Sequence, residues 1–374
     1  MKGLCVYVDG GKGHYIPAKA VQEKLCKKGH DVTLIEFFDL FSLKLVGKVN
    51  KNVWRLMLRM PRYEESFSKH NDQESQGMRI ASWFCRNFKK RKMRKIIEKY
   101  KPDFFFTTHP YPDRFISEIL HKLGIDIPVY YFASDVFSAP MASICPFLKK
   151  FYISTEEGVS IVKKLGQPET SVKLVPFPLQ AACADSPKLS KQQARKILGL
   201  DEDLFTLQIN FGGEGLGTTG LLKELKKSTI PMQILLIGGM DDSTKQRLSR
   251  IAQDFPPHVI VHVIGFVNNV NEYNYAADII AGRAGINTIL EAIYAHRPFL
   301  ITELVYTVLA SADYVEKYNV GWNAALDFVL QASIINKYAN NPGLLDDLDK
   351  NFSKVPIVYD AHKLADIVIE DTLT

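Results

Sequence analysis

The chain has 374 residues, of which 46% are hydrophobic and 24% are charged, and its formal net charge is +6. This length exceeds one ordinary hydrophobic core and predicts two globular domains. Five scattered cysteines without a Cys-x-x-Cys pair indicate neither a disulfide framework nor a zinc site, and they favour a reducing cytoplasm. We expect no signal peptide, and no apolar run approaches the roughly 18 residues that would span a bilayer.

The first half of the chain predicts alternating strands and helices. Strands are expected at residues 4–8 and 32–37, joined by a helix that carries Ala18, Val21 and Leu25 on one face and stops at Gly29. The short apolar runs at 103–107 and 129–133 predict buried parallel strands. Residues 176–189 are rich in Pro, Ala, Ser and Lys without periodicity, which predicts an interdomain linker.

The second half repeats the alternation of strands and helices. The expected strands lie at 204–210, 233–237, 259–264, 278–281 and 299–302, and the tail at 360–373 predicts a helix. The fold class is therefore α/β, with two Rossmann-like doubly wound domains facing a cleft. We expect an N-terminal domain at 1–180, a C-terminal domain at 190–355, and a final helix within 356–374 that can return to the N-terminal domain.

One segment, residues 44–101, carries an excess of positive charge, with 17 Lys and Arg against 5 Asp and Glu. Two interpretations stay open. The segment forms amphipathic helices that pack their apolar faces inward, or it lies on an anionic membrane surface and contacts the lipid acceptor. No zinc knuckle, helix-turn-helix spacing or stacking motif supports a nucleic-acid partner. Under the membrane interpretation the contact residues are Trp54, Arg55, Arg59, Trp83, Lys89, Lys90 and Arg91.

Two glycine-rich turns suit an anionic ligand. The turn at 282–285 follows a strand and starts a helix, so its backbone N–H groups and the positive helix end favour an anion. A second loop, at 212–217, lies about seventy residues upstream, and two such turns on one sheet suggest a diphosphate. Thr288 and Glu291, three residues apart, also fit a plain capping box at the helix start.

A further glycine loop follows the first expected strand. Gly11 and Gly13 begin a dinucleotide fingerprint, but Ile16 occupies the third glycine position, so an NAD site is not supported. His14 follows directly, at the carboxyl end of the strand. An imidazole there can accept a proton from a hydroxyl, or it can merely cap the next helix.

Four motifs, taken in their order along the chain, resemble those of a known protein family. They are Gly11-Lys-Gly13-His14, Phe211-Gly-Gly-Glu-Gly-Leu-Gly217, Gly265-Phe266-Val267, and Arg283-Ala-Gly285 with Thr288-Ile-Leu-Glu291-Ala292. This set resembles the glycolipid-forming glycosyltransferases, in particular monogalactosyldiacylglycerol synthases and processive diacylglycerol glucosyltransferases, with the lipid-linked N-acetylglucosaminyltransferase of peptidoglycan synthesis as a cousin. The resemblance covers residues 4–321 and implies a two-domain GT-B fold.

The resemblance also implies a set of site residues. The nucleotide-sugar site would comprise Gly11, Gly13, Gly212, Gly213, Glu214, Gly215, Gly217, Phe266, Val267, Arg283, Ala284, Gly285, Asn287, Thr288 and Glu291. In it the glycine turns would hold the diphosphate, Glu291 the ribose, and Phe266 and Val267 the uracil. The catalytic residues would be His14, as general base or acceptor-orienting group, and Asp135, which would assist it or would only cap a helix.

The implied activity is an inverting transfer of a hexose from a UDP-sugar to a lipid such as diacylglycerol at the cytoplasmic face of the cell membrane. Fixed N–H dipoles can stabilise the leaving diphosphate, so we expect neither a metal nor a cofactor. The family's Gly-Gln-Glu triplet, which grips the donor sugar, is absent from 302–311, where Glu303 is the only carboxylate. The alternatives are a nucleotide-binding homologue without turnover, a UDP-sugar enzyme with a non-lipid acceptor, and a non-hydrolysing epimerase.

Overall fold

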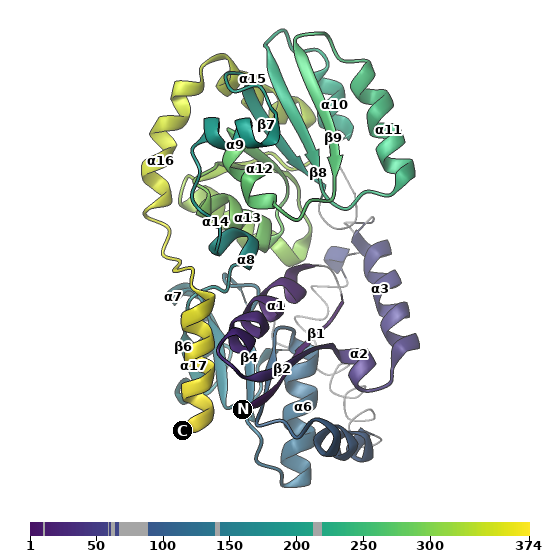
Figure 1. Cartoon of the computed structure of the whole chain (residues 1–374), viewed down its shortest axis with the longest axis vertical. Coiled ribbons are helices and arrows are strands. Elements are labelled where there is room, and N and C mark those ends of the chain that lie inside the picture. The colour runs from purple at the N-terminus through teal and green to yellow at the C-terminus, as the bar shows by residue number, and fades with distance from the viewer. Residues whose placement is uncertain (10–11, 59, 61–63, 67–88, 139–142, 212–218) are drawn as a thin grey trace. The chain divides into compact units, whose positions relative to one another are not determined.

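A computed structural model describes residues 1–9, 12–58, 60, 64–66, 89–138, 143–211 and 219–374 (Figure 1). The chain divides into two compact units, which we call unit 1 (residues 1–180 and 357–374) and unit 2 (residues 181–356). Each unit is built on a six-stranded parallel sheet with flanking helices. The predicted α/β class with two Rossmann-like domains is therefore confirmed.

In unit 1 the sheet has the strand order β2-β1-β3-β4-β5-β6. Its elements are β1 (Lys2–Tyr7), α1 (Lys12–Lys27), β2 (Asp31–Glu36), α2 (Phe37–Leu40), α3 (Lys44–Leu58), helical residues 64–66 and 89–100, β3 (Phe104–Thr107), α6 (Pro110–Leu123), β4 (Val129–Phe132), β5 (Lys150–Ile153), α7 (Glu156–Lys164), η2 (Glu169–Ser171), β6 (Val172–Leu174) and α17 (Ala361–Leu373). The central strands are buried on both faces, which explains their continuous apolar runs.

In unit 2 the order is β12-β11-β10-β7-β8-β9. Its elements are α8 (Ala181–Ala184), α9 (Lys191–Leu198), β7 (Phe205–Asn210), α10 (Thr219–Leu225), β8 (Met232–Ile237), α11 (Asp242–Gln253), β9 (Val259–Gly265), α12 (Val270–Ala276), β10 (Ile279–Arg283), α13 (Ile286–Tyr294), β11 (Phe299–Glu303), η3 (Tyr306–Val308), α14 (Leu309–Lys317), β12 (Gly321–Asn323), α15 (Phe328–Asn340), η4 (Pro342–Leu345) and α16 (Asp346–Phe352). The segment expected to be a linker thus includes the short helix α8.

Each sheet has one point where the strand order reverses. In unit 1 the chain builds outward from β1 to β2 and then from β3 in the other direction, so the reversal lies between β1 and β3. In unit 2 it lies between β7 and β10 for the same reason. The helices that follow two such strands leave on opposite faces, and ligands of α/β proteins bind at the carboxyl ends of these strands. The topology therefore selects two edges at which to look for a site.

Helix α17 belongs to unit 1 (Figure 1). Asp371 fixes it to the sheet, because its Oδ2 accepts a hydrogen bond of 2.7 Å from the Tyr152 hydroxyl and its Oδ1 lies 2.9 Å from Lys173 Nζ. The Tyr130 hydroxyl donates to the Asp371 carbonyl oxygen at 2.7 Å. Asp366 adds an ion pair of 2.7 Å with Lys28 of α1.

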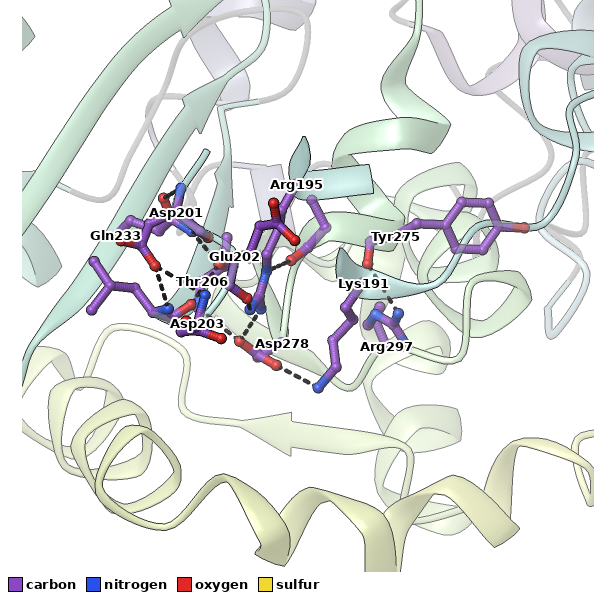
Figure 2. Close-up of polar contacts among 12 residues, drawn as sticks. Lys191, Arg195, Asp201, Glu202, Asp203, Thr206, Gln233, Tyr275, Asp278 and Arg297 are labelled. Atoms are coloured by element: carbon purple, nitrogen blue, oxygen red, sulfur yellow. Dashed lines mark hydrogen bonds and ion pairs between the residues drawn. The ribbon is translucent and has the colours of Figure 1, made fainter. Parts of the chain in front are cut away.

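A buried ion pair fastens α9 to the sheet of unit 2 (Figure 2). Asp278, directly before β10, accepts hydrogen bonds from Arg195 Nη2 at 2.6 Å, Lys191 Nζ at 2.7 Å and the Thr206 backbone N–H at 2.8 Å. The side chains of Asp278 and Arg195 are each only 4% exposed. Beside this network, Gln233 Nε2 donates to the Asp201 carbonyl oxygen at 2.7 Å. These contacts lie at the amino ends of the strands, away from the edge that the topology selects.

Candidate active site

His14 lies at the selected edge of unit 1, in the first turn of α1 after β1. Its Nδ1 is 2.5 Å from the carbonyl oxygen of Thr108, which follows β3, and 3.3 Å from Oγ of Ser134, which follows β4. Thr108 Oγ1 returns a hydrogen bond of 2.7 Å to the His14 carbonyl oxygen. The ends of three strands therefore position one imidazole. His14 does not act as a helix cap, so that alternative is wrong.

The partner of Nδ1 determines the proton arrangement of the ring. A carbonyl oxygen can only accept, so Nδ1 carries the proton that is donated to Thr108 and Nε2 keeps its lone pair. Desolvation by burial lowers the pKa of His14 to about 4, although the hydrogen bond to Thr108 opposes the shift. At neutral pH the ring is therefore a neutral base with a fixed orientation.

His109 is a site residue that the sequence reasoning missed. It follows β3 as His14 follows β1, and the two ring centroids lie 4.4 Å apart with the rings at 69°. Burial lowers the pKa of His109 well below its usual value, and the nearby His14 adds to this shift. The available signal was positional, because each histidine comes shortly after a predicted strand, and the loops after neighbouring parallel strands lie close together.

Asp135 lies in a turn after β4, next to Ser134. It starts no helix in the part of the chain that the structure describes, so the proposal that it only caps a helix gains no support. Burial raises the pKa of its carboxyl group to about 6. The described hydrogen bonds of the His14 ring go to Thr108 and Ser134 and not to Asp135. A catalytic role of Asp135 therefore stays a prediction.

The Arg283-Ala284-Gly285 turn of unit 2 follows β10, one of the two strands at the reversal point. Gly285 is the N-cap of α13 and provides no side-chain cap. Thr288 consequently lies inside the first turn of the helix, so the capping-box interpretation of Thr288 and Glu291 is wrong. Glu291 lies one turn further on and is 6% exposed. Asn287, in the first turn, is also buried.

Strand β7 is the second strand at this reversal point. Gly282 of β10 pairs with Asn210, the last residue of β7, and a Cβ at Gly282 would lie 2.8 Å from the Asn210 carbonyl oxygen. The two backbones therefore approach as closely as only glycine permits. The loop that begins just after β7 contains Gly212, Gly213, Glu214, Gly215 and Gly217, which lie outside the described residues, as do Gly11, Arg59 and Trp83.

Arg283 forms an ion pair beside the turn. Its Nη2 lies 3.1 Å from Oε2 of Glu303, which ends the neighbouring strand β11. Glu303, the one carboxylate in residues 302–311, is thus paired with the Arg283 guanidinium group. Within the described part of the chain, Arg283 Nε is buried without a hydrogen-bond partner.

The remaining predicted nucleotide contacts lie on the same edge or in α1. Phe266 and Val267 follow β9, and Phe266 is 63% exposed. Its contact with a nucleotide stays a prediction. Gly13 lies in the first turn of α1, where a Cβ would meet no atom within 4 Å. The space around Gly13 is therefore open.

The described part of the basic segment contains two helices that differ in their packing. In the helix at 89–100 Met93 and Ile96 are buried, and Lys89 Nζ donates to the Phe41 carbonyl oxygen at 3.3 Å, so this helix packs inward. Lys90 is half-buried there and Arg91 is exposed. Helix α3 differs, because its large apolar side chains are exposed by 47% to 79%: Leu45, Val46, Val49, Val53 and Leu56. The inward-packing interpretation is therefore wrong for α3.

The apolar residues of α3 recur every three or four positions and form one stripe along the helix. Gly47 faces inward, since a Cβ there would lie 2.9 Å from the Phe38 side chain. Trp54 is half-buried, and Arg55 is exposed. No helix of the described chain is long and apolar enough to cross a membrane. Among all residues that the structure describes, no three His, Cys, Asp or Glu side chains gather as a metal site would require.

Two Rossmann-like units with candidate sites at their strand-order reversals define the GT-B class, and solved structures agree. MurG of Acinetobacter baumannii superposes with a TM-score of 0.64 at 15% identity, over 99% of this chain and 100% of that one. The UDP-GlcNAc 2-epimerase of Neisseria meningitidis, bound to UDP-GlcNAc, gives 0.63 at 12% identity over 100% of both chains. At these identities the likeness establishes the fold.

The sequence comparisons define the family resemblance more closely. Residues 219–323 match the glycosyltransferase family 28 C-terminal domain. A probable monogalactosyldiacylglycerol synthase of Glycine max is 27% identical over 58% of this chain and 42% of its own length. A processive diacylglycerol beta-glucosyltransferase of Staphylococcus saprophyticus is 23% identical over 78% of this chain and 73% of its own. The chain thus spans less than half the length of the plant relative, and the predicted resemblance to glycolipid glycosyltransferases is confirmed.

Proposed function

We propose that this protein is an inverting, metal-independent glycosyltransferase that moves a hexose from a UDP-sugar to a lipid acceptor such as diacylglycerol. The observation that carries the proposal is His14, a neutral imidazole whose Nδ1 is bound to Thr108 and whose Nε2 is left to accept a proton. Relatives that make glycolipids and a structural neighbour bound to a UDP-sugar support the same assignment.

The proposed chemistry is a single displacement. The acceptor hydroxyl gives its proton to His14 Nε2 while its oxygen bonds to the anomeric carbon. The bond from this carbon to the diphosphate breaks, and its electron pair leaves with UDP. The N–H groups at the start of α13 and the Arg283 guanidinium group stabilise the added negative charge. Inversion follows because no covalent intermediate forms.

One observation favours a second candidate, a homologue that binds the nucleotide without turnover. The sugar-gripping Gln-Glu pair is absent, and Glu303 is paired with Arg283. Incubation with several UDP-sugars and with diacylglycerol or sterol acceptors in liposomes, read by mass spectrometry, separates these proposals. We expect a glycosylated lipid. Nucleotide binding without any product would support the binding homologue, and conversion of the UDP-sugar without an acceptor would support an epimerase.

Glu291 is expected to bind the ribose hydroxyls of UDP. We predict that Glu291→Gln weakens UDP by about 10-fold in calorimetry, since a charge-assisted hydrogen bond is lost. When 2′,3′-dideoxy-UDP replaces UDP, the wild type should lose affinity, whereas the variant should lose little more. Glu316→Gln, an exposed position on α14, is the control. Equal UDP affinity in Glu291→Gln and the wild type would remove Glu291 from the site.

Helix α3 is proposed to lie on an anionic membrane surface, in keeping with a peripheral location at the inner face of the cell membrane. Its exposed apolar stripe would enter the headgroup layer, and neighbouring basic residues such as Lys48 would meet anionic lipid. Full burial of one such side chain contributes about 1.5–3 kcal/mol, and a side chain in the headgroup layer gains only part of this. We therefore predict that changing Leu45, Val49 and Leu56 together to serine lowers liposome binding by about 10²-fold.

The control for this experiment is Val329→Ser, because Val329 of α15 in unit 2 is similarly exposed, at 68%. Binding of the wild type should rise with the anionic lipid fraction and fall with salt. If the triple variant binds as tightly as the wild type, α3 is not the contact.

A further inference from the structure

His109 contacts two aromatic rings at the edge where β3 ends. The His14 ring lies 4.4 Å away and the Tyr111 ring 4.9 Å away, measured between centroids. His109 is also the N-cap of α6, and its Nδ1 accepts a hydrogen bond of 3.1 Å from the Tyr111 backbone N–H. Both histidines are only half-buried, so this pair of rings borders the surface at the carboxyl ends of the strands.

The two imidazoles are fixed in opposite proton arrangements. The Tyr111 N–H can only donate, so His109 Nδ1 carries a lone pair and the proton of the neutral ring is on Nε2. His14 is the reverse, because the carbonyl oxygen of Thr108 requires a proton on Nδ1. The remaining nitrogens therefore differ in kind: His14 presents an acceptor and His109 presents a donor. Burial keeps both rings neutral near pH 7, since the pKa of each is lowered.

We propose that His109 binds a second oxygen of the acceptor, adjacent to the hydroxyl whose proton goes to His14. The inference rests on the proposed function and specifies its substrate class. The acceptor carries two oxygens on neighbouring carbons, as in a glycerol backbone, where the free hydroxyl lies next to an ester oxygen. A sterol or a simple long-chain alcohol has a single oxygen and cannot use both rings.

His109 keeps its proton throughout the reaction. Only the attacking hydroxyl transfers a proton, to His14 Nε2, while its oxygen bonds to the anomeric carbon and the bond from that carbon to UDP breaks. The role of His109 is to hold the acceptor so that the correct hydroxyl faces the base. An acceptor with one oxygen displaces water from the His109 N–H without giving it a partner, and this is the physical origin of the selectivity.

The test uses His109→Asn in the full chain. Asparagine is among the best N-cap residues, so the start of α6 is kept while the Nε2–H donor is removed. His121→Asn, at the exposed far end of α6, is the matched control. The probes are a short-chain 1,2-diacylglycerol and a primary alcohol of equal apolar size, and their binding is measured by calorimetry without donor, so that the result does not depend on turnover.

We expect His109→Asn to weaken the diacylglycerol by about 10-fold, the scale of a lost hydrogen bond at a desolvated site, and to leave the alcohol unchanged. His121→Asn should change neither. Equal loss for both probes, no loss for either, or no diacylglycerol binding by the wild type would overturn the inference. Normal binding with no sugar transfer by the wild type would instead contradict the proposed function and leave the His109 contact supported.

Discussion

Replacing His14 by asparagine should lower the rate of sugar transfer by about 10²-fold or more, the usual scale for a lost general base. The asparagine amide can still donate to the Thr108 carbonyl oxygen, because its nitrogen occupies nearly the position of Nδ1. The variant therefore removes the proton acceptor at Nε2 and keeps the contact that fixes the side chain. The measurement is kcat with saturating UDP-sugar and acceptor, together with UDP affinity, which should not change.

His14→Ala is the companion variant. It loses the hydrogen bond to Thr108 as well as the base, so we expect the same fall in kcat and an added loss of about 1 kcal/mol in the free energy of unfolding. A stability loss without a fall in kcat would show that His14 only ties α1 to β3. Unchanged turnover in both variants would remove His14 from the chemistry altogether.

The pH dependence gives a second check on His14. With a pKa of about 4, His14 is already neutral and able to accept a proton at pH 6, whereas an ordinary imidazole with a pKa of 6.5 would be largely protonated. Transfer by the wild type should therefore stay nearly constant between pH 8 and pH 6 and fall as the pH approaches 4. A fall centred near pH 6 would point to Asp135, whose raised pKa lies there.

The same shift affects stability with a definite sign. The folded protein resists protonation of His14, while the unfolded chain accepts the proton near pH 6.5. This group contributes stability above about pH 6.5, and the contribution is lost as the pH falls from there toward 4. Acid unfolding should therefore be shifted to lower pH in His14→Asn, which has nothing to protonate.

Sequence reasoning found the strands that carry long apolar runs and missed three short strands. Buried strands such as β3 and β8 are mostly apolar because helices cover both faces. Three short strands escaped prediction: β5, β6 and β12, which have three or four residues and include Lys150, Lys173 or Asn323. They form strands because the neighbouring strand has unpaired backbone N–H and C=O groups, which is a property of the assembled sheet.

Single residues of the candidate site were predictable from the sequence, but the residues that they contact were not. His14 follows a strand in sequence, but Thr108 and Ser134 are 94 and 120 residues away and meet it only because β1, β3 and β4 are neighbours. The Thr288 to Glu291 spacing fits a capping box, and only the observed start of α13 at Ile286 excludes it. Periodicity likewise revealed the amphipathic α3 without indicating which of its faces meets water.

Replacing Asp278 by asparagine should produce the largest loss of stability among the changes considered, about 3–5 kcal/mol, because Arg195 would be left as a buried charge without its anion. Asparagine is nearly the same size and its oxygen can still accept the Thr206 N–H, so the change isolates the charge. For a unit of this size the midpoint of thermal unfolding should fall by about 10 °C.

Lys191→Met is the matched control for the Asp278 change. Lys191 also contacts Asp278, but it is 36% exposed, so its removal should cost no more than about 1 kcal/mol. Combining Arg195→Met with Asp278→Asn should cost less than the sum of the single changes, since the double variant buries no unpaired charge. Additive losses, or a loss below about 1 kcal/mol for Asp278→Asn, would mean that water reaches this pair in solution and that packing, rather than charge, holds α9 to the sheet.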